Sequence, residues 1–457
     1  MICQTALMAM LTPTGWRPTS IGYVDDEEIG ARCHWKYEAD AVSCDIIFDA
    51  LADAWRAQVD EIGFAAPIPD DDGLLDVYIT DQGTGGGAYT TGSYTDEVAD
   101  DGRQACAGYI AVDPEVTHIE LPTFIAHEFN HVLQMATDFR EPTLPMWEGT
   151  ATEAQHWTYP GSNYGQSDMA DFQAAPWLGV LGDGYMLYDD YGLWSYYEYG
   201  SEIWIHHLDA VWGDGAGSGA RDLWTDAIED DNVNEPDVLE ALGMVAGSDW
   251  RDAILQFSAE RVRVGTDSAP DWAAMLGGEM IAVAFEAELD ASELPAEVVP
   301  VVSPYETGAV YVQLSGLGVG QRVRVTLTSD ANVNWGQVLV GDSTDEQATG
   351  SQVDWQVDSS SVVLGAVNLG ADDFDADNQI AEAPVTISIE LSGHDPDTGI
   401  AQDTGDDKNS GKGCGCAASP RAGSAWIALL LALPALRRRQ RQLRRERGPI
   451  GVPLRQG

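Results

Sequence analysis

Five consecutive residues, His127-Glu128-Phe129-Asn130-His131, constrain the fold of this chain more than any other feature of its sequence. Residues four apart on an α-helix share one face, so a helix here would let both imidazoles reach a single metal ion. Glu128 would then point toward water bound to that ion. The flanking apolar residues recur with helical spacing and favour a packed helix over a solvated helical stripe. They are Phe124, Ile125, Val132, Leu133 and Met135.

A third metal ligand is expected in the segment Pro145 to Glu153, which reads Pro-Met-Trp-Glu-Gly-Thr-Ala-Thr-Glu and begins a second helix. A catalytic zinc ion takes three protein ligands and keeps one position open. Glu148 and Glu153 are the two candidates. They lie about 140° apart around a helix, so only one of them can face the metal.

Together, His127 to His131 and the stretch Trp147-Glu148-Gly149-Thr150-Ala151 resemble the motifs of the gluzincin metallopeptidases. In that family the third zinc ligand is the glutamate of a comparable stretch on the next helix, so the resemblance favours Glu148 over Glu153. From about Ala31 to Glu260 the chain also resembles a group of secreted bacterial metallopeptidases that carry C-terminal sorting tails. The resemblance implies one catalytic Zn²⁺ held by His127, His131 and Glu148.

The same resemblance implies a zinc metalloendopeptidase that acts on a protein or peptide substrate. Zinc would activate a water molecule, and Glu128, as the general base, would remove its proton and deliver it to the leaving amine. Related enzymes steady the oxyanion with a Tyr or His from a downstream region, and we expect Tyr199 in this role. In the family, the strand before the active-site helix lines the cleft, which would place Gly108 to Val112 alongside an extended substrate.

The charge of the chain excludes one class of partner. The formal net charge is −52, and the first 400 residues carry 12 Lys+Arg against 71 Asp+Glu. A surface this negative repels the phosphates of nucleic acids, so we expect no nucleic-acid partner.

Hydrophobic patterns predict an α+β chain with several parts. For residues 29–266 the patterns predict a mixed sheet followed by a helical half, and the gluzincin resemblance implies that they form a zincin-like domain containing the active-site helix. Residues 267–392 alternate short β-rich runs with Gly, Asn, Asp and Ser turns, which favours an antiparallel β-sandwich. The other segments are an N-terminal segment (1–28), an acidic, Gly-rich linker (393–421) and a membrane segment with an Arg-rich cytoplasmic tail (422–457).

Particular elements can be predicted within these regions. We expect a long helix from Val42 to Ile62 and a flexible loop at Gly83 to Gly87. The expected strands of the first region are Arg32–Tyr37, Leu75–Thr80 and Gly108–Val112. Those of the second are Met280–Leu289, Ala309–Leu314, Arg322–Thr328, Gln337–Val340, Ser361–Val367 and Pro384–Leu391.

Apolar runs near both ends bear on localisation. Ile2 to Leu11 has the length of a signal-peptide core but lacks preceding basic residues and a clear cleavage site, so we interpret it as a remnant signal peptide. Ala422 to Leu436 is an apolar run followed by a cluster of arginines. Positive charge marks the cytoplasmic side, so this run would hold the body of the protein outside a membrane. It is shorter than the roughly 20 residues of a spanning helix, although arginine side chains can snorkel; the alternative is a soluble basic helix.

The tail resembles the myxobacterial C-terminal sorting domain, in which a short Cys motif precedes an apolar helix and an Arg cluster. The Cys motif here is Gly413-Cys414-Gly415-Cys416. The resemblance implies a sorting enzyme that acts near Cys414 and Cys416. We therefore expect an exported protein anchored at the cell surface through its tail.

Two further features stay open at the level of sequence. Cys33 and Cys44 can form a disulfide in an oxidising compartment or remain buried free thiols. The acidic clusters Asp70 to Asp72 and Asp373 to Asp377 could bind Ca²⁺, whose ligands are oxygens. Such clusters are common in so acidic a chain, and no calcium site is assigned.

Two other functions compete with a general peptidase. One is a surface-anchored binding or adhesion protein with a vestigial peptidase domain. The intact set of His127, Glu128, His131 and Glu148 argues against it, because a decayed site usually loses a ligand or its general base. The other is a self-processing surface protein that cuts its own linker or a partner.

Overall fold

The computed structural model describes residues 17–70, 72–92, 104–141, 143–161, 166–193, 195–228, 236–265, 282–342, 345–376 and 380–392. Ile2 to Leu11, the linker 393–421 and the tail 422–457 lie outside these ranges, as do Asp71 and Asp377 of the acidic clusters. Among the described residues, no helix is long and apolar enough to cross a membrane. The predictions for both ends therefore stay predictions.

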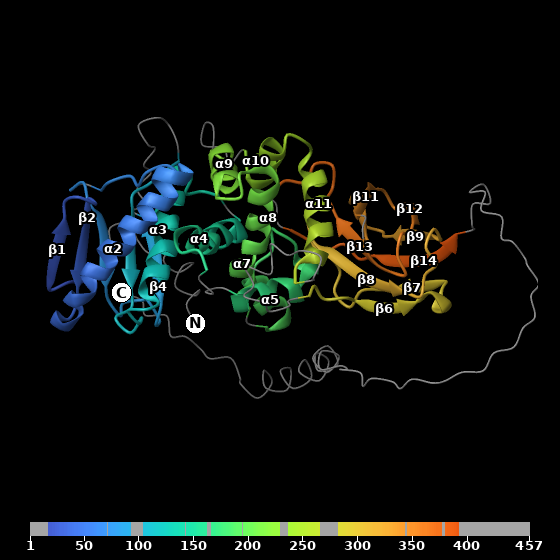
Figure 1. The fold of residues 1–457 in the computed structure, drawn as a ribbon, viewed down its shortest axis with the longest axis horizontal. Helices are drawn as coiled ribbons and strands as arrows, with labels where there is room; N and C mark the ends of the chain where they lie inside the picture. Colours follow the sequence, from blue (N-terminus) through green and yellow to red (C-terminus); the bar gives the residue numbers. More distant parts are fainter. Residues whose placement is uncertain are drawn as a thin grey trace, which may run out of the picture. The chain divides into compact units, whose positions relative to one another are not determined.

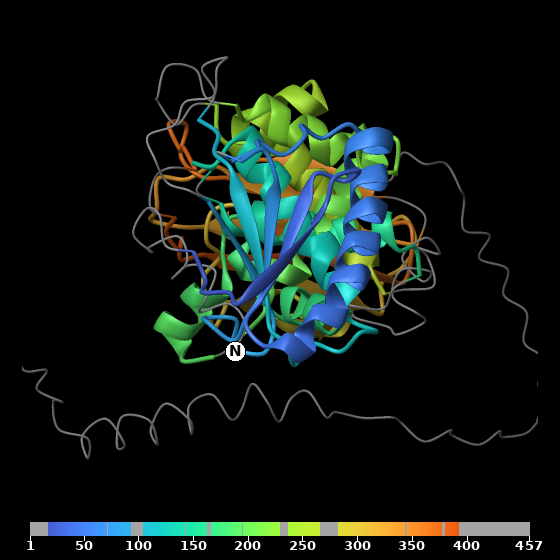
Figure 2. The ribbon, with the colours of Figure 1, turned by 90° about the vertical axis from the view of Figure 1, so that its left-hand side faces the viewer.

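A five-stranded mixed sheet begins the described chain, with strand order β1-β2-β3-β5-β4 (Figure 2). The parallel strands β2, β3 and β5 lie inside the sheet, and β1 and β4 pair antiparallel at its edges. The helical connection between β2 and β3 provides the crossover that a parallel pair needs. The strands are β1 Gly22–Asp26, β2 Ala31–Trp35, β3 Leu75–Ile79, β4 Ala88–Gly92 and β5 Gly108–Val112.

The two faces of this sheet bury different side chains, because successive residues of a strand point to opposite sides. Ile110 and Val112 join the large apolar core with the helices. Tyr109 and Ala111 lie on the other face, in a small cluster with two more tyrosines. Both faces of the central strands are thus buried.

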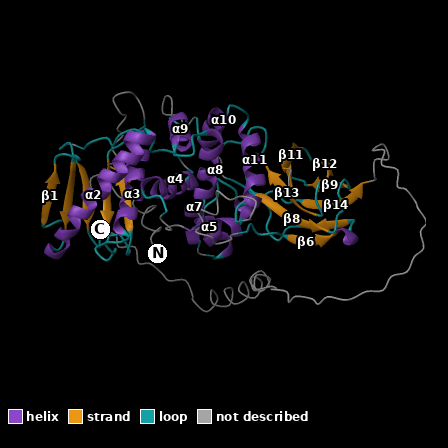
Figure 3. Ribbon diagram, in the orientation of Figure 1, coloured by secondary structure: helices purple, strands orange, loops and turns teal. Residues whose placement is uncertain are grey.

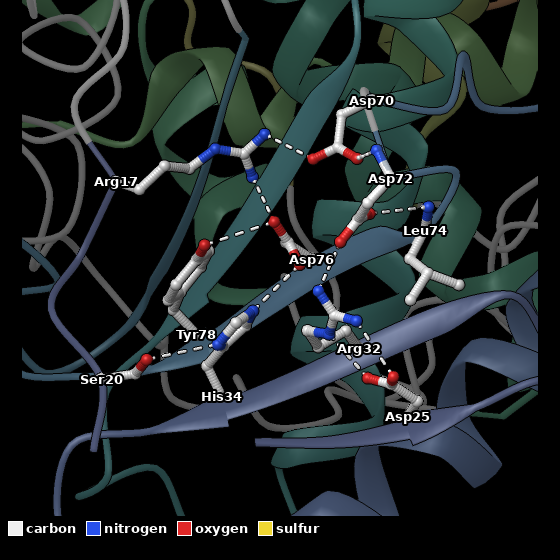
Figure 4. Close-up of polar contacts among 10 residues, drawn as sticks. All are labelled: Arg17, Ser20, Asp25, Arg32, His34, Asp70, Asp72, Leu74, Asp76 and Tyr78. Carbon is white, nitrogen blue, oxygen red and sulfur yellow. Dashed lines mark hydrogen bonds and ion pairs between the residues drawn. The ribbon is translucent and has the colours of Figure 1, made fainter. Parts of the chain in front are cut away.

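Ion pairs hold the start of the described chain to the tyrosine face (Figure 4). The Arg17 guanidinium contacts Asp76 at 2.7 Å and Asp70 at 2.8 Å, and lies 4.7 Å from the centre of the Tyr109 ring. Asp76 also bonds Nε2 of His34 at 3.0 Å. Asp70 of the first acidic cluster is thus ion-paired with Arg17.

A helical layer covers the other face of the sheet (Figures 1 and 3). The predicted long helix is a 3₁₀ turn (Glu38–Ser43), α2 (Cys44–Ala54) and a π-helical end (Trp55–Ile62), which Gly63 terminates in a left-handed conformation. A disulfide joins Cys33 of β2 to Cys44 of α2, with Cα atoms 5.7 Å apart. This bond decides between the two alternatives left open by the sequence and ties the helix to the sheet.

The helices α3 to α11 follow, where the sequence predicted a helical half. α4 packs against α3, α7 and α8, and α9, α10 and α11 follow. The elements are α3 Leu121–Thr137, α4 Leu144–Thr158, α5 Gln166–Ala174, the 3₁₀ turn Pro176–Leu178, α6 Gly184–Met186, the π-turn Leu187–Tyr191, α7 Tyr197–Gly200, α8 Glu202–Trp212, α9 Ser218–Asp226, α10 Val238–Ala246 and α11 Trp250–Arg263.

Two further sheets, ordered β11-β10-β13-β8-β6 and β12-β9-β14-β7, share one apolar cluster between them. All of their pairs are antiparallel except β6 with β8. The hydroxyl of Tyr311 donates to the Ser258 carbonyl of α11 at 2.7 Å, which links these sheets to the helices. Their elements are β6 Ala287–Asp290, the 3₁₀ turn Ala291–Glu293, β7 Ala296–Val298, β8 Ala309–Ser315, β9 Arg322–Thr328, β10 Trp335–Val340, β11 Asp345–Thr349, β12 Gln352–Gln356, β13 Ser361–Asn368 and β14 Thr386–Ser392.

The architecture is a mixture of helices and several mostly antiparallel sheets, compatible with the expected α+β class. Most expected strands are present within a residue or two. The run Met280–Leu289 is the main exception: its strand is restricted to Ala287–Asp290, and residues 282–286 form none. β1, β4, β7, β11 and β12 were not expected; β1, β4 and β11 lack an apolar alternation, and β7 has only three residues. β12 does alternate, as Gln-Val-Asp-Trp-Gln, and was missed at the level of sequence.

Candidate metal centre

Helix α3 carries the histidine pentad in the middle of its 17 residues. Pro122 occupies its first turn, where a missing backbone N–H costs no hydrogen bond. Ile125, Val132 and Leu133 are fully buried in the core shared with the sheet and α2. The helix is therefore packed in the core along most of its length. The residues His127, Glu128 and His131 are buried with it, at 6%, 5% and 8% exposure.

The imidazoles of His127 and His131 converge with the carboxylate of Glu148 from α4. The two Nε2 atoms lie 3.1 Å apart, and Oε2 of Glu148 lies 3.2 Å from His127 Nε2 and 3.4 Å from His131 Nε2. Tetrahedral ligands bound about 2.0 to 2.2 Å from an ion such as zinc are about 3.3 to 3.6 Å from one another. The three donor atoms nearly have this spacing, and the three residues form a group that could hold a metal ion.

Three amide side chains, Gln58, Asn130 and Gln134, form a hydrogen-bonded amide relay that orients His131. The Gln134 amide nitrogen donates to Oδ1 of Asn130 (2.9 Å) and to the carbonyl of Trp147 (3.0 Å). Its Oε1 therefore accepts from Nδ1 of His131, at 2.6 Å. A proton on Nδ1 leaves the lone pair of Nε2 free for a metal.

The relay is anchored on the backbone at its far end as well. Asn130 donates to Oε1 of Gln58 at 3.1 Å, and the Gln58 nitrogen donates to the Ala126 carbonyl at 2.9 Å. Every amide orientation is thus set by a backbone carbonyl, at Trp147 or at Ala126. The tautomer of His131 follows from these two fixed points.

Gln155 occupies the corresponding place beside His127. Its amide group lies 3.2 Å from Nδ1 of His127, and its Oε1 is buried with no hydrogen-bond partner among the described residues. An amide turned by 180° would bring Oε1 to Nδ1 and accept its proton. In that orientation the orphaned oxygen is satisfied and His127 Nε2 faces the metal.

The close approach of α4 to its neighbours places Glu148. A Cβ atom on Gly149 would lie 2.4 Å from Oγ of Ser201 and 3.1 Å from its backbone carbon. Only glycine lets α4 pack this tightly against the start of α8. The glycine of the Trp-Glu-Gly sequence therefore has a packing role next to the ligand.

Glu128 lies beside the three donor atoms without being one of them. Thr90, on the edge strand β4, has its hydroxyl 2.9 Å from Oε2 of Glu128 and 2.8 Å from its backbone carbonyl. Burial raises the pKa of Glu128 above its ordinary value, although the nearby histidines oppose the shift. A carboxyl group with a raised pKa is a better proton acceptor than an exposed one.

The charges of the ligands are strongly coupled. Burial lowers the pKa of His131, but the charge and hydrogen bond of Glu148 outweigh this and raise it to about 9. Burial raises the pKa of Glu148, and the two imidazoles more than reverse the shift, so the net pKa is lowered. The carboxylate is therefore ionised and in place to bind a cation.

Tyr199 reaches the same centre from α7. Its ring stacks on that of His127, with centroids 5.7 Å apart and an interplanar angle of 20°. The structure thus brings together all five residues singled out in the sequence: His127, Glu128, His131, Glu148 and Tyr199.

Glu153, the competing candidate for the third ligand, is 3% exposed and bonds His206 instead of the α3 histidines, which leaves Glu148 as the carboxylate beside the two imidazoles. One sequence expectation near the centre is wrong. β5, Gly108–Val112, is paired on both sides by β3 and β4, so its backbone has no free edge for a substrate. The edge strand at this end of the sheet is β4.

Sequence reasoning missed Thr90, Gln134 and Gln155. A signal existed for Gln134, which lies three residues after His131 and hence on the same helical face. Thr90 and Gln155 reach the centre from other elements, and no spacing rule connects them to α3.

Comparisons with known proteins identify no family. No protein-family model matches the chain, and no curated protein is detectably similar to it. Among solved structures, the pre-peptidase C-terminal domain of a collagenase from Bacillus anthracis is 9% identical, covering 23% of this chain and 97% of its own, with a TM-score of 0.18.

Two other solved structures are similarly remote. The Aeromonas hydrophila periplasmic inhibitor of g-type lysozyme is 12% identical, covering 24% of this chain and 100% of its own, with a TM-score of 0.19. A family GH115 4-O-methyl-α-glucuronidase is 10% identical, covering 62% and 46%, with a TM-score of 0.16. At such TM-scores none of these likenesses carries an argument.

Proposed function

We propose that this chain is a zinc metalloendopeptidase of the gluzincin type, exported and anchored at the cell surface through its tail. One observation carries the proposal: the donor atoms of His127, His131 and Glu148 converge at ligand spacing, with Glu128 beside them. The donor set suits zinc, which binds imidazole and carboxylate and keeps a fourth position open in catalytic sites. The proposed domains are a zincin-like domain with the metal centre, followed by a β-sandwich.

When bound, zinc would supply Lewis-acid chemistry, polarising a carbonyl group and lowering the pKa of water to about 7. The carboxylate of Glu128 would act as the general base, holding a proton and returning it to the leaving amine. The Thr90 hydroxyl steadies the carboxylate through these transfers. The Tyr199 hydroxyl is proposed as the donor to the oxyanion, which the stacking of its ring on His127 supports.

The position of the edge strand β4 is an argument for a peptide substrate. Thr90 lies on this strand and reaches Glu128, so a chain paired along β4 would run past the general base. Backbone pairing accepts many side chains, as an endopeptidase requires. β4 therefore replaces β5 as the proposed wall of the cleft.

Glu128→Gln tests the enzyme against a metal-binding relic. The substitution keeps the shape and the Thr90 bond but removes the proton acceptor. Zinc content and folding should stay at the wild-type level, while cleavage of an unfolded protein substrate such as casein falls by roughly 10² to 10⁴. A matched control is Glu115→Gln, which changes an exposed glutamate in the turn before α3 and should leave cleavage unchanged.

Two results would overturn the proposal. If the zinc-loaded wild type cleaves nothing in a broad peptide library, the chain is better explained as a surface-anchored binding protein with a vestigial peptidase domain. If Glu128→Gln cleaves as fast as wild type, another group activates the water.

A further inference from the structure

A second group of ionisable side chains lies between α4 and α8, separate from the metal centre. Glu153 and His156 come from α4, one helical turn apart, and Glu202 comes from α8. One ligand atom from each residue lies within 4.8 Å of the other two. Nε2 of His156 and Oε2 of Glu202 are 3.1 Å apart. This group has no role in the proposed reaction.

Two carboxylate oxygens of this group lack partners. Oε2 of Glu153 and Oε1 of Glu202 are buried and have no hydrogen-bond partner within the described ranges. Their residues are 3% and 0% exposed. An ionised carboxylate removed from water is costly unless a charge compensates it, and one imidazole faces each carboxylate here. Two orphaned oxygens on facing helices make a site rich in acceptors.

A neighbouring residue outside this group of three, His206, fixes the orientation of the Glu153 carboxylate. Its Nδ1 lies 2.9 Å from Oε1 of Glu153, the oxygen that has a partner. This contact leaves Oε2 as the atom of Glu153 that is available as a ligand. His206 is thus a positioning residue, in the manner of groups that orient metal ligands by hydrogen bonds.

We infer that Glu153, His156 and Glu202 bind a second divalent transition-metal ion, which joins α4 to α8. Sites of this kind are built in helical proteins from side chains on facing helices. The imidazole nitrogen favours zinc or a similar ion over calcium, which prefers oxygen ligands throughout. Because Glu148 lies on α4 five residues before Glu153, the second ion would also hold the helix that supplies the proposed catalytic ligand.

Zinc itself is the probe, and metal content per chain is the readout. Full-length protein is loaded with zinc, freed of excess ion and analysed for metal. Wild type should retain about two ions, and Glu202→Gln or His131→Ala about one each. The double variant should retain about none. Glu198→Gln, a matched buried glutamate four residues before Glu202, should retain both ions.

The pattern separates this inference from the proposed function. A wild type with about one ion, lost in Glu202→Gln but kept in His131→Ala, would overturn the catalytic site and uphold the second one. Equal zinc content in wild type and Glu202→Gln would overturn the second site. If Glu202→Gln fails to fold, Glu153→Gln keeps the acceptor for His206 and takes its place; two ions in that folded variant would likewise overturn the inference. So would a second equivalent that is filled by calcium and never by zinc.

Discussion

Replacing Gln134 by leucine would test whether the amide relay sets the metal affinity of His131. Gln134 is fully buried and makes three hydrogen bonds, to His131, Asn130 and the Trp147 carbonyl. Leucine has a similar volume and makes none of these bonds. The ring of His131 would lose the partner that keeps its proton on Nδ1.

The contacts of Gln134 allow two losses to be estimated: one in the free energy of unfolding and one in zinc affinity. Each buried polar group left without a partner costs about 1 to 3 kcal/mol. Gln134→Leu leaves Oδ1 of Asn130 and the Nδ1 proton of His131 unpaired, whereas the Trp147 carbonyl keeps its bond inside α4. Because such costs are not additive, we expect a loss of about 3 kcal/mol or more in the free energy of unfolding. Removing the hydrogen-bond partner of a metal-binding histidine typically weakens metal affinity by about 10- to 100-fold.

The assay compares zinc dissociation constants from competition with a chelator, alongside urea denaturation of the metal-free protein. Gln173 provides the control: it is also fully buried, and its amide bonds the carbonyl and the guanidinium of Arg261. Gln173→Leu should therefore lose stability while keeping its zinc affinity. A folded Gln134→Leu with the zinc affinity of wild type would refute the reasoning, as would equal weakening in both variants.

Three other predictions follow from features outside the relay. Replacing Cys33 and Cys44 by alanine should lower the free energy of unfolding by about 3 kcal/mol, because the disulfide links residues 11 positions apart in the sequence. Denaturation with and without reductant would measure this loss, and the absence of any reductant effect on the wild type would contradict it. Gly149→Ala should destabilise the protein by about 1 to 3 kcal/mol, because its methyl group would collide with Ser201; a stabilised variant would show that the helices separate freely. Burial raises the pKa of Glu198 from its ordinary value of 4.5 to about 8. Between these two pH values the native state holds a proton that the unfolded chain has released, so the free energy of unfolding falls as the pH rises from 4.5 to about 8. Glu198→Gln should thus gain a few kcal/mol at pH 9 and nothing at pH 4 in denaturant titrations, since each tenfold change in proton affinity is about 1.4 kcal/mol; an equal gain at both pH values would contradict this.

The parts of the fold that periodicity governs were predictable. The spacing of apolar residues around His127 and His131 predicts a buried helix, and α3 spans both histidines. The runs Gly108–Val112 and Arg322–Thr328 coincide with β5 and β9. In each case the burial of one or both faces of the element requires apolar residues at regular spacing, and this spacing is visible in the sequence.

Other features depend on pairings between distant residues and leave no local signal. β4 reads Ala-Tyr-Thr-Thr-Gly and follows a glycine-rich loop. Its Tyr and Thr residues favour a strand, but no apolar alternation marks it as a buried edge strand. Gln58 joins the relay across 72 residues from Asn130. Glu153 looks like one more acidic side chain on an amphipathic helix, and its burial becomes visible only once α8 packs against α4.

The amide relay also bears on the electronic character of a bound ion. A carboxylate in the place of Gln134 would share negative charge with the imidazole and make it a stronger electron donor. A neutral amide holds the ring in the same orientation and contributes no charge. A divalent ion between two neutral imidazoles and one carboxylate would keep a net charge of about +1. The relay would not reduce this charge, because its amides are neutral. Since amides do not titrate, this electrophilicity would not change with the protonation of the groups that hold the ring of His131.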